Sequence, residues 1–290
     1  GCCGTTPEHI RWLHHLLVNN VKPPKKLMPA VYSTDRQSGC EQEAAEEKTE
    51  LIQKLERGEK IFVVELDPPF DANDTKLMDG ASLLRDIGVD MITLADSPLA
   101  RPRADSIASA IKMRYTRQME AMPHISCRDK NVIAHRAQLL GMHMNGLRHA
   151  LIVTGDPIAR GDRESIKSVF NFNSIKLMKY VQTMNREVFG NRPIYYGGAL
   201  NHNNGSADNI AARMRLKMEA GAQWFLTQPI YGQDDIDRLR ELKEKSGGRI
   251  IWKQLWSVCF RRRIAVKRSK PPCGNRCYRH YVHRRYHKRQ

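Results

Sequence analysis

Several short apolar runs in this sequence carry, at or near their ends, side chains that can exchange protons or bind an anion. The run 61–66 contains Glu65, and Asp67, Pro68 and Pro69 follow it directly. Comparable residues lie at the later runs, namely Thr93, Asp96, His124, Cys127, Thr154, Gly155, Asp156, the segment 201–204, Thr227 and Gln228. In a sheet of parallel strands the carboxyl ends lie at one edge, so we expect these side chains to form one polar site.

Glu65 is the clearest candidate for chemistry because it emerges from the apolar sequence IFVV. Apolar surroundings favour the protonated form of a carboxyl group, because they disfavour its charged form. A protonated carboxyl group can act as a general acid. For Asp96 and Asn203, a solvated loop start or a helix cap is an equally good interpretation. The strand ends carry neither an HxH pair nor clustered carboxylates, which argues against a metal hydrolase. The pattern predicts an acid–base enzyme that acts on an organic substrate.

The elements that must position these residues alternate regularly. Amphipathic helical stretches separate the apolar runs, and several of them end at a glycine, namely Gly88, Gly146, Gly190 and Gly221. Alternating strands and helices predict a parallel sheet. More than six repeats without a GxGxxG motif favour a (βα)8 TIM barrel over a doubly wound sheet. We predict seven strands, at 61–66, 90–96, 123–127, 150–155, 193–200, 223–228 and 249–252.

The predicted barrel occupies residues 41–252 and is incomplete at its C-terminal end. Its first part, 41–60, is helical by composition and ends at Gly58. Before it, residues 22–40 are rich in Pro, Lys and Ser and predict an interdomain linker. Residues 1–21 predict a turn that leads into a helix, with Thr6 as the N-cap and Pro7 at the first helical position.

The basic character of the chain is concentrated in its last residues. Residues 253–290 hold 13 of the 48 Lys and Arg and no Asp or Glu, which leaves +4 of the formal net charge of +17 for the rest. Nucleic-acid binding is therefore an alternative rather than the first expectation. The composition of this tail is typical of a sequence translated in a wrong reading frame. We predict that the tail is disordered.

Two other interpretations of the tail stay open. It could contact nucleic acid or anionic lipid as a basic segment. It could also form a zinc knuckle, although only five residues separate the cysteine pair from the histidine pair among Cys273, Cys277, His283 and His287.

The overall composition restricts the class of protein further. No run of about 18 apolar residues is present, so no membrane span and no membrane partner are expected. No basic segment followed by an apolar stretch marks a secretory signal at the beginning of the sequence. Seven cysteines at irregular spacing fit a reducing cytoplasm better than a disulfide scaffold. The oligomeric state is open, and a homo-oligomer is among the expected forms.

The ordered motifs resemble the methylenetetrahydrofolate reductase family. They are VVELDPPFDAN, MITLADSPLARPR, PHISCRDKN, ALIVTGDP and KMEAGAQWFLTQPIY, and the resemblance covers residues 41–252. It implies a TIM barrel that binds FAD and uses NAD(P)H to reduce methylenetetrahydrofolate to methyltetrahydrofolate. An inactive barrel fragment that retains some affinity for FAD is the alternative.

The resemblance also implies roles for single residues. Glu65 matches the general acid that protonates a folate nitrogen, Asp156 the carboxylate near the flavin, and Gln228 a glutamine that contacts the folate. The implied FAD-binding set is Thr93, His124, Gly155, Asp156 and Lys217, with Lys217 near the phosphates of the cofactor. The sequence departs from the family pattern at Thr154, where many relatives have arginine, and at Leu66 and Asp67, which replace aromatic residues.

The opening sequence GCCGTTPEHI resembles the C-terminal signature of zinc-dependent homocysteine S-methyltransferases. Together, the two resemblances match a bacterial protein that joins both activities, with residues 1–21 as the end of the methyltransferase domain and homocysteine as its substrate. Adjacent Cα atoms are about 3.8 Å apart, so a disulfide between Cys2 and Cys3 would be strained. The resemblance implies that Cys2 and Cys3 bind zinc with a third, upstream cysteine, so we expect zinc only in the complete methyltransferase domain.

Overall fold

The computed structural model describes residues 6–19, 45–59 and 61–252, and the chain divides into two units at residue 44. In the first unit the described part is the helix α1 (Pro7–Val18). It begins at Pro7, as predicted, and the backbone N–H of Ile10 donates to the carbonyl of Thr6. Cys2, Cys3, the predicted linker 22–40 and the tail 253–290 lie outside the described residues.

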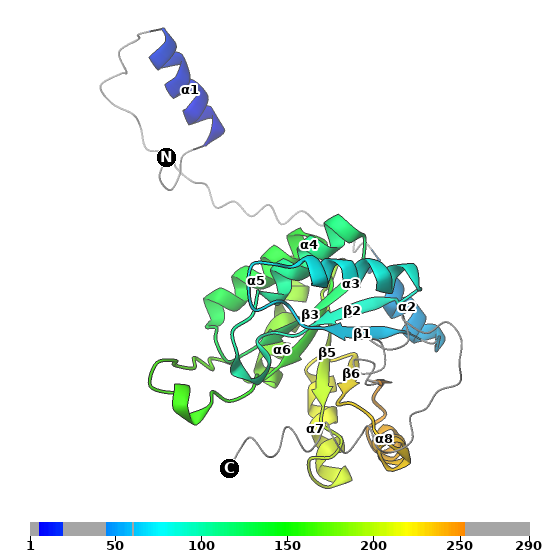
Figure 1. The fold of residues 1–290 in the computed structure, drawn as a ribbon. Helices are drawn as coiled ribbons and strands as arrows, with labels where there is room; N and C mark the ends of the chain where they lie inside the picture. Colours follow the sequence, from blue (N-terminus) through cyan, green and yellow to red (C-terminus); the bar gives the residue numbers. More distant parts are fainter. Residues whose placement is uncertain (1–5, 20–44, 60, 253–290) are drawn as a thin grey trace, which may run out of the picture. The chain divides into compact units, whose positions relative to one another are not determined.

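The second unit is built on one curled parallel sheet (Figure 1). Its strands follow each other in space in the order of the sequence, β1 to β7, and each pair of neighbours is parallel. This order confirms the predicted barrel topology, in the form of a seven-stranded half-barrel. The strands are β1 (Val63–Leu66), β2 (Met91–Leu94), β3 (Ala121–Ser126), β4 (His149–Val153), β5 (Tyr195–Leu200), β6 (Trp224–Thr227) and β7 (Ile250–Ile251).

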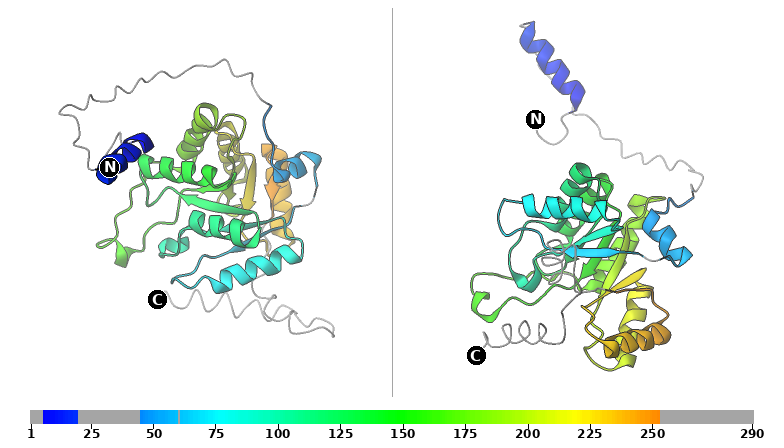
Figure 2. Two further views of the ribbon diagram at one scale, coloured as in Figure 1. Left: turned by 90° about the horizontal axis from the view of Figure 1, so that it is seen from above. Right: turned by 45° about the vertical axis from the view of Figure 1, so that its right-hand side comes forward.

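Helices follow the strands and cover the outer face of the curl (Figures 1 and 2). Most of them are two to four turns long. They are α3 (Thr75–Asp86), α4 (Ser106–Arg117), α5 (Val132–Met144), α6 (Ser174–Met184), α7 (Ala207–Glu219) and α8 (Gln233–Ser246), whereas α2 (Glu50–Arg57) precedes β1. The described residues of this unit also form three short helical turns, namely η1 (Pro98–Ala100), η2 (Arg160–Asp162) and the π-helical turn η3 (Asn185–Phe189).

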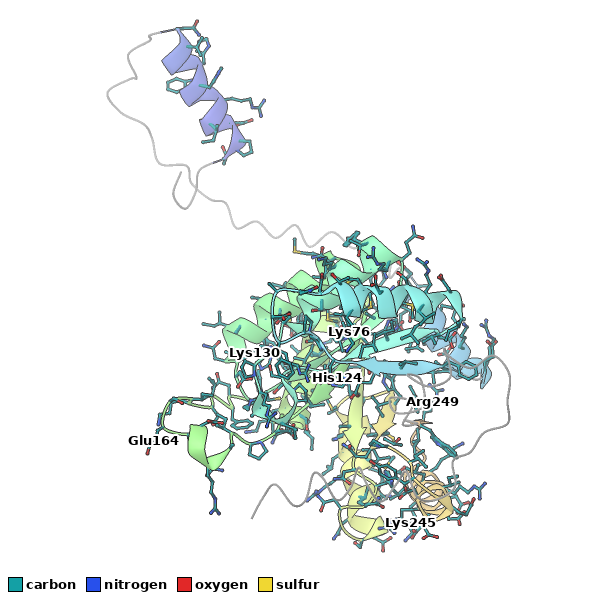
Figure 3. The ribbon with its side chains drawn as sticks, in the orientation of Figure 1. Lys76, His124, Lys130, Glu164, Lys245 and Arg249 are labelled. Atoms are coloured by element: carbon teal, nitrogen blue, oxygen red, sulfur yellow. The ribbon has the colours of Figure 1, made fainter. Side chains whose placement is uncertain are left out.

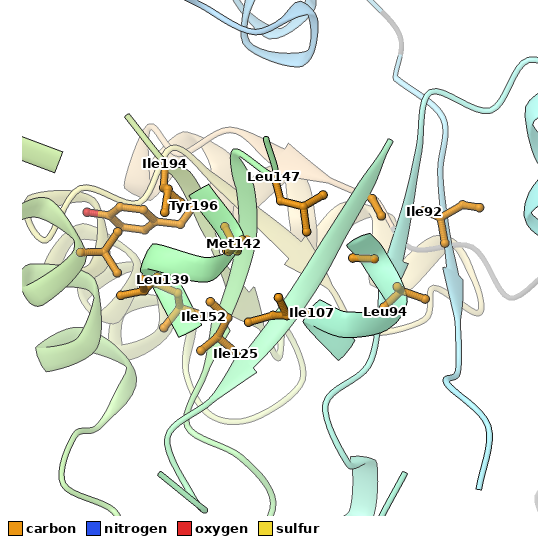
Figure 4. Packing of buried hydrophobic residues seen from close by; sticks show 14 of the residues in the cluster. Ile92, Leu94, Ile107, Ile125, Leu139, Met142, Leu147, Ile152, Ile194 and Tyr196 are labelled. Carbon is orange, nitrogen blue, oxygen red and sulfur yellow. The ribbon is translucent and has the colours of Figure 1, made fainter. Parts of the chain in front are cut away.

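Each strand contributes side chains to two different cores, because successive side chains point to opposite faces of a sheet. On the outer face, Ile92, Ile125 and Ile152 pack against the covering helices (Figure 4). On the inner face, a second cluster contains Met91, Met122, Leu151, Tyr195, Trp224 and Leu226, together with Leu51 and Ile52 of α2. The helix α2 therefore fills the inside of the curl at the amino ends of the strands.

The predicted helix over 41–60 is wrong for residues 45–49, since α2 begins only at Glu50, and residues 41–44 lie outside the described residues. The residues directly before α2 contact the amino ends of β4 and β5 instead of forming a helical turn. Tyr195 Oη donates to Glu46 at 2.5 Å, and Thr49 Oγ1 lies 2.7 Å from His149 Nε2. These tertiary contacts override the helical composition.

The third strand also begins earlier than predicted, at Ala121. His124 therefore lies in the middle of β3 rather than at its start. Pro123 is tolerated within this strand, where it is aligned with Leu94 of β2.

Candidate functional site

Three of the predicted site residues lie together on the inner face of the sheet. They are nearer the carboxyl ends of the strands than the apolar cluster that contains Leu51 and Ile52 of α2. Glu65 and Thr93 are partners in the register of β1 and β2. His124 comes from β3, and its Nε2 is 4.0 Å from Glu65 Oε2. Figure 3 labels His124 among the strands of the sheet. This separation is longer than a hydrogen bond, so the carboxyl group and the imidazole are neighbours in the site rather than a directly bonded pair.

Glu65 keeps some access to solvent, and Thr93 has none. The side chain of Glu65 is 25% exposed and that of His124 is 12% exposed. Thr93 is fully buried, and its hydroxyl has no hydrogen-bond partner among the described residues. A buried hydroxyl in this state favours a ligand that supplies the missing hydrogen bond.

Gly155 lies directly after β4 and brings the backbone close to β3. Its φ is +92°, and a Cβ atom built on it would lie 2.3 Å from Ser126 Oγ. Both the conformation and the space require glycine. The loop after β4 consequently starts with backbone packed against β3.

Asp156 follows Gly155 and is bound to the loop after β2. Its Oδ2 accepts a 2.6 Å hydrogen bond from the backbone N–H of Leu99. Ser97, Leu99 and Ala100 all have positive φ angles, between 45° and 57°. Three non-glycine residues in this region indicate a strained segment that its surroundings hold in place.

The ends of β5 and β6 are joined at the same edge of the sheet. The backbone N–H of Gln228 donates to the carbonyl of Leu200, so Gln228 is placed beside the end of β5. His202 is fully buried, and its Nε2 lies 3.2 Å from Asp235 Oδ1. Hydrogen bonds from Asn203 and from the backbone N–H of Tyr231 lower the pKa of Asp235. This network ties the loop after β5 to the start of α8.

Lys217 is separated from the inner-face group. It belongs to α7 and packs over the outer side of β5, where its Nζ donates to the carbonyl of Ala199 at 2.7 Å. It borders a cavity of about 200 Å³ whose other polar residues are Asn201, Asn204 and Arg213. Burial, and to a lesser extent the charge of Arg213, lowers the pKa of Lys217 to about 8.

This lowered pKa predicts a change of stability with pH. Above pH 8 the folded chain releases the Lys217 proton, whereas the unfolded chain keeps it until about pH 10.5. The unfolded state then binds more protons, so the free energy of unfolding should rise with pH across this window. From pH 7 to pH 10 we expect the wild type to gain about 2–3 kcal/mol relative to Lys217→Met, measured by urea unfolding.

The matched control for this measurement is Lys179→Met, which replaces an exposed lysine on α6. Its pH profile should follow that of the wild type. Parallel profiles for the wild type and Lys217→Met would contradict the prediction.

Two residues of the site were not found from the sequence. Asp235 looked like an ordinary acidic residue in the first turn of a helix. Arg128 follows β3 and is only 3% exposed, but a charged residue in a loop gives no sign of burial. The sequence CRD at a strand end was the available signal.

Two further observations concern the described part of the chain. Within it, no three His, Cys, Asp or Glu side chains come together as a metal site. None of its helices is long and apolar enough to span a membrane.

A curled sheet of parallel βα units whose strands follow each other in the order of the sequence defines the class of TIM-barrel folds. Residues 50–251 match the family model described as "Methylenetetrahydrofolate reductase". The chain therefore belongs to the methylenetetrahydrofolate reductase family, as the motifs implied.

The other comparisons carry no argument about this chain. No curated protein matches the sequence. Among solved structures, a 2,3-dimethylmalate lyase of the PEP mutase/isocitrate lyase superfamily has a TM-score of 0.49 and 12% identity, over 74% of this chain and 83% of that chain. A putative deoxyribose-phosphate aldolase from Coccidioides immitis has a TM-score of 0.44 and 11% identity, over 67% and 71% of the two chains. These similarities carry no conclusion about function.

Proposed function

We propose that this chain reduces 5,10-methylenetetrahydrofolate to 5-methyltetrahydrofolate, with FAD as cofactor and NAD(P)H as reductant. The observation that carries the proposal is the group Glu65, Thr93 and His124 on the inner face of a reductase-family barrel. The reaction would place the protein in one-carbon metabolism and in the supply of methyl groups for methionine biosynthesis, in the cytoplasm.

The residues at the carboxyl ends of the strands fit FAD. Thr93 offers a buried hydroxyl that has no partner among the described residues. Gly155, which has no side chain, lets the backbone after β4 lie close to Ser126 of β3. His124 and Asp156 supply a ring and a carboxylate beside them. Lys217 would hold the phosphates from the outer side of β5, next to the cavity that it shares with Arg213. When bound, FAD supplies the transfer of hydride from NAD(P)H to the folate.

Glu65 and Gln228 would act on the folate itself. Glu65 donates the proton of its carboxyl group to a ring nitrogen of the substrate, which opens the bridge that holds the one-carbon unit. The resulting cationic carbon accepts hydride more readily than the closed ring does. Gln228, fixed beside the end of β5 by its backbone, orients the folate.

The first test is binding of FAD by the full chain. We expect saturable quenching of flavin fluorescence and a higher unfolding temperature with FAD. Thr93→Val keeps the shape of the side chain but removes its hydroxyl, and it should weaken binding about tenfold. Thr75→Val, at an exposed position on α3, is the control and should bind as the wild type does.

Absence of saturable FAD binding by the wild type would contradict the proposal. Equal affinities of the wild type and Thr93→Val would contradict the assigned role of Thr93. Assays with NADH and with NADPH would identify the reductant.

For the N-terminal residues we propose a separate origin. Residues 1–21 would be the end of a homocysteine S-methyltransferase domain, with Cys2 and Cys3 as two of its zinc ligands. This rests on the resemblance of GCCGTTPEHI alone. Since two thiolates do not complete a zinc site, replacing Cys2 and Cys3 by serine should change the zinc binding of the chain little.

A further inference from the structure

Arg128 is a buried charge at the junction of three loops. It is 3% exposed, and it follows β3, between the loops after β2 and β4. One edge of its guanidinium forms a two-point pair with Asp129, with Nε to Oδ1 at 2.8 Å and Nη2 to Oδ2 at 2.7 Å. This pair fixes the orientation of the guanidinium plane and directs the remaining donors away from Asp129.

Those remaining donors bind the two neighbouring loops. Nη1 donates to the carbonyl of Asp156 at 3.1 Å, and both Nη atoms lie 3.3–3.4 Å from the carbonyl of Ser97. The backbone of Arg128 adds a third connection, since its carbonyl accepts from the N–H groups of Val169 and Phe170, at the far end of the loop after β4. A single residue thus contacts the loop after β2 and both ends of the loop after β4.

The segment that Arg128 holds is the one that orients Asp156. Ser97, Leu99 and Ala100 adopt positive φ angles, which such residues keep only when neighbouring groups hold them. In this conformation the N–H of Leu99 reaches the carboxylate of Asp156. The guanidinium therefore fixes both partners of that hydrogen bond, the donor through Ser97 and the acceptor through the backbone of Asp156.

We propose that Arg128 is a positioning residue, which acts through Asp156 by locking the loops after β2 and β4 against each other. The structural part of this inference stands on the contacts alone. Its consequence for the reaction rests on the proposed function, because it assumes that Asp156 faces the flavin.

The test compares Arg128→Lys with the wild type by hydrogen exchange of the full chain. Lysine keeps the charge but cannot bind Asp129, Asp156 and Ser97 at once. We expect the amide of Leu99 to exchange at least tenfold faster, with unchanged exchange in the strands. Arg136→Lys, at an exposed position on α5, is the control and should leave this amide unchanged. Wild-type exchange at Leu99 in Arg128→Lys would overturn the proposal.

A second variant keeps the proposal testable if Arg128→Lys does not fold. Asp129→Asn leaves the guanidinium in place but weakens the pair that orients it. It should accelerate exchange at Leu99 in the same direction, by a smaller factor, and unchanged exchange would again overturn the proposal.

A kinetic measurement tests the consequence for the reaction. In Arg128→Lys we expect kcat for folate reduction to fall at least tenfold, with a smaller change in KM, because the groups that bind the folate are not moved. If the wild type binds no FAD, the proposed function fails, and hydrogen exchange still decides the role of Arg128. If FAD binds and kcat is unchanged, the inference about Asp156 is wrong.

Discussion

In the proposed reaction, Glu65→Gln should lower the rate of folate reduction by about 10²–10⁴-fold while leaving the reduction of FAD by NAD(P)H intact. Glutamine has nearly the same shape but cannot donate the proton that opens the folate ring. The transfer of hydride from NAD(P)H to FAD needs no such proton, so it should proceed at the wild-type rate. The two half-reactions can be followed separately by the absorbance of the flavin after rapid mixing.

The matched control is Glu244→Gln, which changes an exposed glutamate on α8. It should leave both half-reactions unchanged. Normal folate turnover in Glu65→Gln would refute the role of Glu65 as general acid. Equal losses in both half-reactions would indicate instead that the substitution disturbs the binding of FAD.

Gly155→Ala should destabilise the folded chain by about 2–5 kcal/mol. The new methyl group would meet Ser126 Oγ at 2.3 Å and Arg128 Cβ at 3.0 Å, and the φ of +92° is unfavourable for alanine in any case. The left-handed conformation costs about 1–2 kcal/mol, and overpacking of this kind typically adds about 1–3 kcal/mol. Urea unfolding of the variant measures the sum.

Gly161→Ala provides the comparison within the same loop. A Cβ atom at Gly161 would meet nothing within 4 Å, and its φ is not in the left-handed region. We expect its free energy of unfolding to stay within about 0.5 kcal/mol of the wild type. If Gly155→Ala were equally mild, the close approach of the loop to β3 would not be a constraint on this chain.

The order of the strands could be predicted from the sequence because it depends on local patterns. Each of the first six apolar runs is followed by a helical stretch, and this alternation already predicts a parallel sheet. Glu65, Thr93 and His124 were expected close together because each belongs to a predicted parallel strand, and their role in one site stays a prediction.

The details that the sequence did not reveal depend on contacts between distant residues. Thr49 precedes α2 rather than lying within it, and its hydroxyl contacts the ring of His149, which is 100 residues further along the chain. Arg128 is buried because two other loops surround it, and no local pattern encodes that. Lys217 was expected near the cofactor, but its place on the outer side of β5 follows from the packing of α7 over Gly198.

The contacts of α2 have a consequence for the order of folding. Each strand pairs with its neighbour in the sequence, so the sheet can grow one βα unit at a time, with short loops to close. The segment 46–57 is different, since its partners Arg148, Tyr195, Trp224 and Ile251 are far along the chain. It can dock only after most strands are in place, although it is the first part of this unit to be synthesised. We therefore expect this helix to close the core last.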